Sequence, residues 1–348
     1  MKLMKRVWAA LLLLAASGQL YADEGMWVLK ELNKQNLARM AELGFTPSYD
    51  QLYSETDPCV ANAVVIFGGG CTGITVSNEG LIFTNHHCGF GAIQQLSSVE
   101  HDYLKDGFVS QSKQEELPVP GLTVRYLKET VDVSDRINSQ ISGIEDEFQR
   151  LSAADSIGRV ICDSVGNNEF LAADVVPFYS NNKYFLVVYD VYRDVRMVFA
   201  PPSSIGKFGG DTDNWMWPRH TGDFSVFRIY ANKQNGPADY SPENVPYHPE
   251  YVAPISLDGY KEGSFCMTLG YPGSTERYLS SYGIEEMMNG INQAMIDVRG
   301  VKQAIWKREM DRHPDIRIKY ASKYDESSNY WKNSIGMNKA IRHLKVLE

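Results

Sequence analysis

Gly68-Gly69-Gly70-Cys71-Thr72-Gly73, followed by Gly80-Leu81-Ile82-Phe83-Thr84-Asn85-His86-His87-Cys88-Gly89, is the stretch of sequence that decides the fold of this chain. Two short apolar runs, residues 63–67 and 81–84, flank a Ser-Asn-Glu-Gly segment at 77–80. Short apolar runs on either side of Asn and Gly are typical of a β-hairpin. The second predicted strand therefore ends at a pair of histidines.

Cys88 follows His87 directly, and we predict a disulfide from Cys88 back to Cys71 across the hairpin. A histidine that alternates between general base and general acid needs a rigid anchor, which this bridge would supply. The two Cα atoms should then lie within about 7 Å of each other. The chain has 5 cysteines, so the pairing of the remaining Cys59, Cys162 and Cys266 stays open.

The same residues have two other interpretations, a buried histidine pair beside a structural cysteine and a metal site made of His86, His87 and Cys88. Adjacent residues on a strand point to opposite faces, so three consecutive side chains cannot reach one ion without distortion. The sequence therefore predicts neither a metal nor another cofactor.

A second polar cluster, residues 208–223, is rich in glycines and polar donors and leads into a predicted strand at 224–230. A carboxylate at the start of a strand can be held rigidly toward a neighbouring imidazole and fix its tautomer. Asp223 is therefore the predicted orienting acid. Asp211 and Asp213 compete with it on composition alone, and a Gly-rich turn with solvated carboxylates is the remaining alternative.

The N-terminus predicts an exported protein, periplasmic or secreted. Basic residues among the first six precede an apolar run at 7–16 and a small residue, Ala22, so residues 1–22 are typical of a secretory signal peptide. No later stretch approaches the roughly 20 apolar residues that a membrane helix requires. The formal net charge of −9 makes nucleic acids and anionic membranes unsuitable partners.

Length and periodicity predict two domains in the 348 residues. Residues 23–275 indicate a β-rich domain with a helix at 27–43 that stops at Gly44, and with strands at 123–133, 174–179 and 183–197. A helix or helical pair is inserted near 134–163, and its predicted apolar face consists of Ile137, Ile141, Ile144, Phe148 and Leu151.

Residues 276–348 predict the beginning of an α-helical domain, because apolar residues recur there at helical spacing. The chain stops at Glu348 without a Gly, Asn or Pro to end the helix, so we expect this domain to be truncated. The predicted core stripe consists of Met287, Met288, Ile291, Met295, Ile296 and Val301.

Three motifs carry a family resemblance: the hairpin, the run Gly-Gly-Asp-Thr-Asp-Asn-Trp-Met-Trp-Pro-Arg-His-Thr-Gly-Asp-Phe-Ser at 209–225, and Leu-Gly-Tyr-Pro-Gly-Ser-Thr at 269–275. Together they resemble the bacterial dipeptidyl-peptidases seven and eleven, which are exported serine exopeptidases. The segment 84–88 is also similar to the Thr-Ala-Ala-His-Cys signature of chymotrypsin-type peptidases. The resemblance implies a chymotrypsin-like β-barrel, here an incomplete double barrel, followed by the helical domain, and a homodimer at full length.

The resemblance also implies roles for individual residues. His87 falls on the catalytic base and Asp223 on the orienting acid. Asn214 and Trp215 fall on residues that bind the N-terminal amine of a peptide substrate, and Asn329 of the helical domain joins them. A free ammonium needs acceptors such as an Asn side-chain carbonyl, and an aromatic face adds cation–π attraction.

The chain departs from the family in one respect. Family members are much longer and carry their nucleophilic serine near the C-terminus in a Gly-Asn-Ser-Gly-Ser-like motif, which this sequence does not contain. Ser203, Ser204 and Ser274 lack the Gly-x-Ser-Gly context that builds an oxyanion hole. We therefore expect the N-terminal half of a serine dipeptidyl-peptidase, inactive alone. The alternative is a non-catalytic, secreted peptide-binding protein that retains the amine-recognition half.

Overall fold

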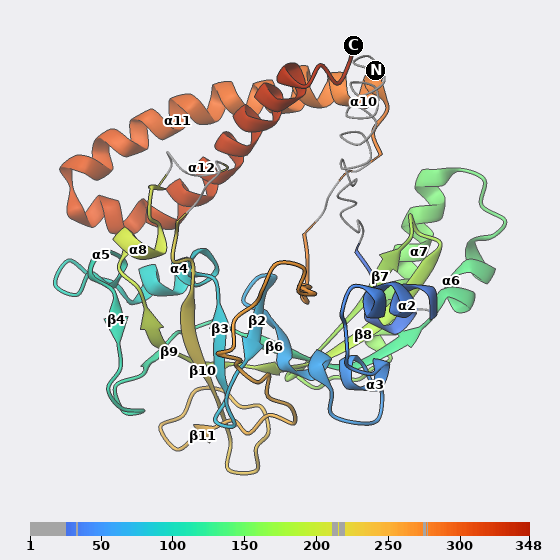
Figure 1. Ribbon diagram of the computed structural model, residues 1–348, viewed down its shortest axis with the longest axis horizontal. Coiled ribbons are helices and arrows are strands. Elements are labelled where there is room, and N and C mark those ends of the chain that lie inside the picture. The colour runs from blue at the N-terminus through green and yellow to red at the C-terminus, as the bar shows by residue number, and fades with distance from the viewer. Residues whose placement is uncertain (1–25, 33, 211–214, 216–219, 274–275, 277) are drawn as a thin grey trace, which may run out of the picture.

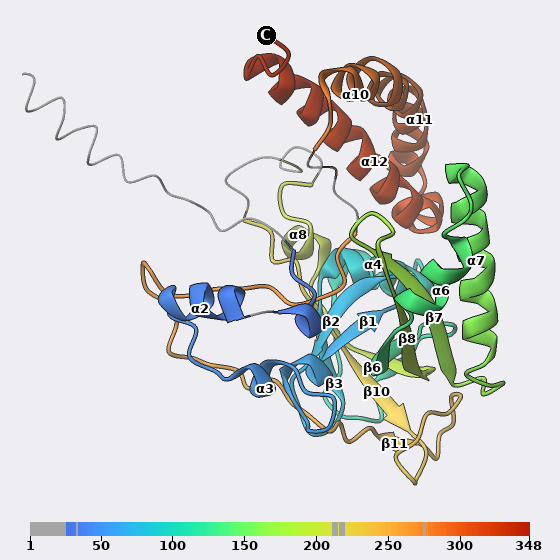
Figure 2. The same ribbon diagram turned by 90° about the vertical axis from the view of Figure 1, so that its right-hand side faces the viewer.

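The computed structural model describes residues 26–32, 34–210, 215, 220–273, 276 and 278–348 (Figure 1). The predicted signal peptide lies outside this described part. An antiparallel sheet forms the centre, a helical pair lies at one end of it, and long C-terminal helices lie above it (Figures 1 and 2). None of the described helices combines the length and the apolar character that crossing a membrane requires.

The strands are β1 (Val64–Phe67), β2 (Cys71–Thr75), β3 (Leu81–Thr84), β4 (Phe108–Val109), β5 (Leu117–Pro118), β6 (Val124–Asp132), β7 (Leu171–Phe178), β8 (Lys183–Tyr192), β9 (Asp194–Ala200), β10 (Ser225–Ala231) and β11 (Val245–Pro246). The α-helices are α2 (Lys34–Glu42), α3 (Tyr49–Leu52), α4 (His86–Leu96), α5 (Tyr103–Asp106), α6 (Ser134–Ile141), α7 (Glu147–Asp163), α8 (Ser203–Gly206), α10 (Ser281–Glu286), α11 (Gln293–Arg312) and α12 (Pro314–His343). Short 3₁₀ turns occupy Leu29–Glu31 and Val60–Ala63, and a π-helical turn occupies Met287–Asn292.

The described strands form one sheet of 11 strands in the order β4-β9-β10-β3-β2-β1-β6-β8-β7, with β5 paired to β9 and β11 to β10. No hydrogen-bonded pairing among the described strands closes this path into a ring, so the β-barrel stays a prediction. The main core joins side chains of the strands to side chains of α4, and within it Phe67 of β1 and Phe227 of β10 pack with their ring centroids 4.8 Å apart. This core is what fixes the position of α4 above the sheet.

The predicted hairpin was wrong in its first strand, which was placed at 63–67, the position of β1. The turn at 77–80 joins β2 to β3, whereas β1 precedes β2 and pairs with its other edge. β2 has weak apolar character because it contains Gly73, where a Cβ would lie 2.8 Å from the side chain of Ile82. β2 and β3 can approach this closely only with a glycine at position 73. The same glycine lowers the apolar character of β2, which is why the apolar pattern did not predict this strand.

The other predicted elements of the β-rich part are largely confirmed. The N-terminal helix is split into a 3₁₀ turn and α2, and it stops before Gly44, which has φ +104°. The strand at 123–133 is β6, and the strand predicted at 174–179 is β7. The run predicted at 183–197 is two strands, β8 and β9, interrupted at Arg193.

The insert is the helical pair α6 and α7, and its predicted apolar face is correct only in its first half. Ile137 and Ile141 are buried, but the side chain of Phe148 is 81% exposed. The chain turns between the two helices, which resets the helical phase. As a result α7 buries Ala154, Gly158 and Ile161 against β7 in place of the predicted Phe148 and Leu151.

The C-terminal helices also depart from their predicted core stripe. Met288 is buried, but Ile291 and Val301 are 57% and 65% exposed. The seam between the π-helical turn and α12 is partly polar, because Asn292 Nδ2 donates to Asn338 Oδ1 at 2.9 Å and Asn338 Nδ2 donates to the Met288 carbonyl at 3.0 Å. The predicted core stripe was wrong at Ile291 and Val301 because two packed helices bury only the narrow faces that they turn toward each other. Small and amide side chains fill the seam between these faces.

Candidate active site

The sheet register explains how two residues 136 positions apart meet. β10 pairs with β3 so that Ser225 lies opposite Thr84. The residues just before β10 are therefore placed beside the residues just after β3. Those residues are Asp223 and the first turn of α4, which begins at His86.

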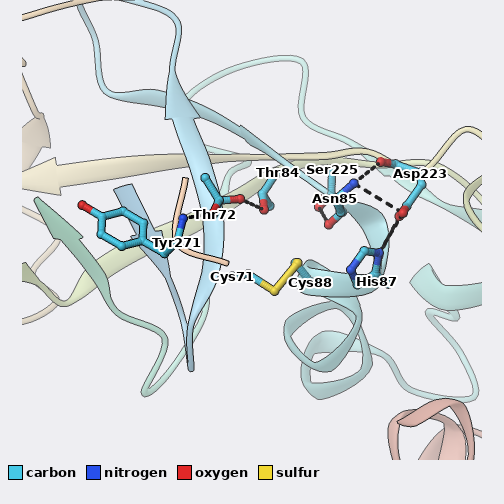
Figure 3. The surroundings of a disulfide bond; sticks show 9 residues. All are labelled: Cys71, Thr72, Thr84, Asn85, His87, Cys88, Asp223, Ser225 and Tyr271. Atoms are coloured by element: carbon cyan, nitrogen blue, oxygen red, sulfur yellow. Dashed lines mark hydrogen bonds and ion pairs between the residues drawn. A yellow bond between two sulfur atoms is a disulfide. The ribbon is translucent and has the colours of Figure 1, made fainter. Parts of the chain in front are cut away.

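His87 and Asp223 are joined by two hydrogen bonds (Figure 3). The His87 ring nitrogen Nδ1 lies 2.7 Å from Asp223 Oδ2, and the His87 backbone N–H donates to Asp223 Oδ1 at 3.0 Å. An ionised carboxylate only accepts, so the proton of this pair belongs to Nδ1. That tautomer leaves Nε2 as the acceptor, which is the arrangement a general base needs.

The electrostatics of the pair keep Asp223 ionised. Burial raises the pKa of this carboxyl, but hydrogen bonds from the side chain and the backbone of His87 outweigh burial, and the neighbouring His86 acts in the same direction. The net result is a pKa of Asp223 below its usual value. The carboxylate is therefore charged at neutral pH and is suited to stabilising an imidazolium ring.

His86 lies on the other side of the helix and is 1% exposed. Its ring packs edge-on to Phe90 and against the backbone of Gly206. Burial lowers its pKa, although the carboxylates of Asp223 and Asp325 oppose this effect, so its neutral form is favoured. The predicted contact with Asp223 is thus made by His87 and not by His86. The roles of His87 as base and of Asp223 as orienting acid remain predictions.

We expect Gly206→Ala to destabilise the protein by about 1–3 kcal/mol, the usual cost of overpacking a filled site. A Cβ at this position would lie 2.6–2.8 Å from three atoms of the buried His86 ring. Urea unfolding followed by circular dichroism measures the change. Gly91→Ala is the matched control, because its nearest neighbour is 3.9 Å away and alanine favours the helix there. Equal stability of the two variants would contradict the packing argument.

The predicted disulfide between Cys71 and Cys88 is present, with the two Cα atoms 6.0 Å apart. It ties the start of β2 to the first turn of α4, next to His87 (Figure 3). The other three cysteines are free. This settles the open pairing within the described chain: Cys59, Cys162 and Cys266 form no bridge.

The metal interpretation is disfavoured for a different reason from the one that the sequence suggested. His86, His87 and Cys88 lie on a helix and not on a strand, so strand alternation does not apply. The donor atoms of Cys71, His87 and Cys88 do lie within 4.8 Å of one another. Both sulfurs, however, belong to the disulfide and cannot act as thiolate ligands. This donor set does not fit a metal ion while the bridge is intact.

Replacing both bridged cysteines, Cys71→Ser with Cys88→Ser, should cost about 3 kcal/mol of stability. The bridge closes a loop with a sequence separation of 17, and a loop of this size restricts the unfolded chain by roughly that amount. Urea unfolding of the variant and of Cys266→Ser, an exposed free cysteine, gives the comparison. A thiol titration of the denatured wild type that finds more than the three free cysteines would contradict the bridge.

Trp215 and Asn329, two of the predicted amine-binding residues, are in contact. The Trp215 indole Nε1 donates to the backbone carbonyl and to Oδ1 of Asn329, both at 3.1 Å. Asn329 belongs to α12, so the helical part of the chain reaches the polar cluster that ends at Asp223. Asn214, Asp211 and Asp213 lie outside the described residues.

Further contacts hold α12 against the sheet domain. Gln94 of α4 bonds to the backbone of α12 through both ends of its amide, accepting from the Ser322 N–H at 2.7 Å and donating to the Lys319 carbonyl at 3.2 Å. Ion pairs join Lys207 to Asp325 and Arg317 to Asp102. The helical part is thereby placed next to the His87 helix (Figure 2).

Of the candidate serines, Ser203 donates its hydroxyl hydrogen bond to the Leu104 carbonyl. Ser204 is exposed on α8, and Ser274 lies outside the described residues. Two further residues were missed by the sequence analysis: Asn85, whose amide donates to Asp223, and Ser225, whose hydroxyl donates to the Asn85 carbonyl. Asn85 had a visible signal, because Asn is a preferred residue just before a helix, but only the structure shows what its side chain binds.

A His–Asp pair at the start of a helix that a disulfide anchors to an antiparallel sheet has the geometry that the acid–base part of a triad-type hydrolase requires. Comparison with known families agrees with this class. The chain belongs to the peptidase S46 family, whose model matches residues 22–348.

Its relatives include dipeptidyl-peptidase 7 of Porphyromonas gingivalis, which is 60% identical over 347 residues, or 100% of this chain and 49% of the relative. The Asp/Glu-specific dipeptidyl-peptidase of Porphyromonas endodontalis is 43% identical over 99% of this chain and 49% of the relative. The crystal structure of Porphyromonas endodontalis DPP11 with the dipeptide Arg-Asp superposes with a TM-score of 0.87 at 42% identity, covering 94% of this chain and 48% of that one. The chain thus spans about half the length of the curated relatives it matches.

Proposed function

We propose that this chain is the acid–base and N-terminus-recognition half of an exported serine dipeptidyl-peptidase, which releases dipeptides from the N-termini of peptides. The observation that carries the proposal is the pairing of His87 with Asp223, at 2.7 Å, in a family whose relatives are dipeptidyl-peptidases. The homologous crystal structure holds a dipeptide, which supports peptides as the substrate class.

In the proposed mechanism His87 Nε2 accepts the proton of a serine that lies outside this sequence, and it later returns the proton to the departing amine. Asp223 holds the ring in the required tautomer and stabilises the imidazolium ion. The disulfide limits movement of the first turn of α4 relative to β2, so the ring keeps one position during both transfers.

The peptide N-terminus is proposed to bind at Asn214, Trp215 and Asn329. Amide oxygens accept hydrogen bonds from an ammonium group, and a Trp face adds about 0.5–2 kcal/mol of cation–π attraction. The contact of Trp215 with Asn329 links this site to α12. An amine held at a fixed distance from the nucleophile would place cleavage after the second residue.

The remaining proposals concern the whole protein. We propose that residues 23–275 form the first barrel, and that residues 276–348 begin the helical domain. Disulfides persist in oxidising compartments. The bridge between Cys71 and Cys88 therefore supports the proposed periplasmic or secreted location of this protein. The full-length protein is proposed to be a homodimer.

A chimera tests the function directly. Residues 23–348 are joined to the part of Porphyromonas gingivalis dipeptidyl-peptidase 7 that this chain does not match. We expect the chimera to cleave dipeptidyl fluorogenic substrates, to be blocked by a serine-directed inhibitor and to ignore N-acetylated substrates. The same chimera with His87→Ala is the control. Unchanged turnover in that control, or cleavage of acetylated peptides, would reject the proposal.

The contact of Trp215 with Asn329, which joins two residues of the proposed amine site within this chain, favours a second candidate, a secreted peptide-binding protein. Calorimetric titration of the chain alone with a tripeptide and with its N-acetylated form addresses it. Tight binding of the free peptide, together with an inactive chimera, would support the binding protein over the peptidase.

A further inference from the structure

Asn85 occupies the cap position before α4 but does not cap the helix. Its backbone is extended, with φ −70° and ψ 152°, as at an ordinary cap, yet its side chain accepts no hydrogen bond from the first turn. A capping Asn would accept from the N–H of the second or third helical residue. The N–H of the second residue, His87, is bound by Asp223 Oδ1.

The Asp223 carboxylate therefore takes the position of the helix cap. A negative charge at a helix N-terminus is stabilised by the unpaired N–H groups there and by the helix dipole. One oxygen of Asp223 satisfies the helix backbone, and the other binds the His87 ring. The same interaction thus fixes both the backbone and the side chain of His87.

The Asn85 amide points at Asp223 instead of at its own helix (Figure 3). Its Nδ2 lies 3.2 Å from the Asp223 backbone carbonyl and 3.4 Å from Oδ2. Both of these oxygens are acceptors, so the amide must face them with its NH₂ group. Asn85 therefore acts as a donor where a capping residue would act as an acceptor.

Ser225 fixes the backbone of Asn85. Its hydroxyl donates to the Asn85 carbonyl at 3.0 Å, and its side chain is fully buried. The backbone of Gly89 packs directly over this hydroxyl, because a Cβ there would lie 2.6 Å from Ser225 Oγ. Asn85 is thus fixed on its backbone side by Ser225 while its amide reaches Asp223.

We propose that Asn85 is a positioning residue, whose amide holds the Asp223 carboxylate in the plane that lets it bind the ring and the backbone N–H of His87 at once. The inference rests on the proposed function, in which His87 is the base. It adds a fourth member, outside the triad, to the group of residues that sets the orientation of the imidazole.

The test compares Asn85→Ala with Asn85→Asp in the chain as it stands. Aspartate is nearly isosteric and is as good a helix cap as asparagine, but its carboxylate cannot donate and it places a like charge beside Asp223. The readouts are the downfield ¹H resonance of the His87 Nδ1 proton and the NMR titration of the Asp223 carboxyl carbon. Among the described residues, the titratable groups that act on Asp223 are His87 and His86, so the titration is repeated in His86→Gln.

We expect the downfield resonance in wild type, its weakening in Asn85→Ala and its loss in Asn85→Asp, with the pKa of Asp223 rising in the same order. A capping role predicts the opposite order, with Asn85→Asp equal to wild type and only Asn85→Ala changed. That outcome would overturn the inference while leaving the peptidase proposal intact. Absence of the resonance from wild type itself would overturn both.

Discussion

Expressed by itself, this chain is expected to release dipeptides at a rate lower than that of the chimera by a factor on the order of 10⁶. The reason is chemical, because a base and an orienting acid cannot cleave an amide without a nucleophile and oxyanion donors. The sequence lacks the family's serine motif, and the hydroxyl of Ser203 is bonded to the Leu104 carbonyl. The measurement is turnover of dipeptidyl fluorogenic substrates by the purified mature chain.

The control for this prediction is the unmatched half of the P. gingivalis relative, assayed alone and mixed with the chain. Activity that requires both parts would show that the chain supplies the acid–base residues. Robust turnover by the chain alone, sensitive to a serine-directed inhibitor, would show instead that one of its own serines is the nucleophile, and the assignment of a missing half would be wrong.

Asp223→Asn is expected to lower kcat of the chimera about 10⁴-fold, with little effect on KM. An Asn side chain can donate to Nδ1, which leaves the proton on Nε2, so the ring presents a donor to the serine where an acceptor is required. The fold should survive, since Asn still accepts one hydrogen bond from the helix N-terminus. Stopped-time assays over a range of substrate concentrations separate kcat from KM.

Asp190→Asn is the matched control, because Asp190 forms an ion pair with Lys128 on the sheet and does not contact the histidines. Its kcat should stay within a factor of about two of wild type, as expected for a surface pair worth less than about 1 kcal/mol. If Asp223→Asn were as active as this control, Asp211 or Asp213 would become the better candidate for the orienting acid.

The sequence by itself was sufficient where local chemistry decides the outcome. Asn and Gly at 77–80 specify a turn, and Gly44 stops a helix, because few other residues adopt these backbone conformations. The bridge between Cys71 and Cys88 followed from a short separation along the chain. Asp223 was predicted to be the orienting acid from its place at a strand start. In the structure the register of β10 on β3 places it beside His87.

Trp215 and Asn329 are a different case. They are 114 positions apart, and no spacing or periodicity joins a loop of the sheet domain to a helix near the end of the chain. Their pairing was expected from resemblance to a family alone. The structure brings them together because α12 crosses α4 and is held there by Gln94 and by ion pairs.

Only the tertiary structure decided which faces were buried and what the polar side chains bind. Phe148 and Val301 fit apolar helical patterns but are exposed, because burial depends on which neighbour a helix meets and not on its own period. Asn85 stands at the cap position of α4, a helix that the sequence analysis did not predict, and Asp223, brought in by a distant strand, binds the helix N–H in its place. A charged acceptor binds that N–H more strongly than an amide oxygen does, so the long-range contact replaces the local one.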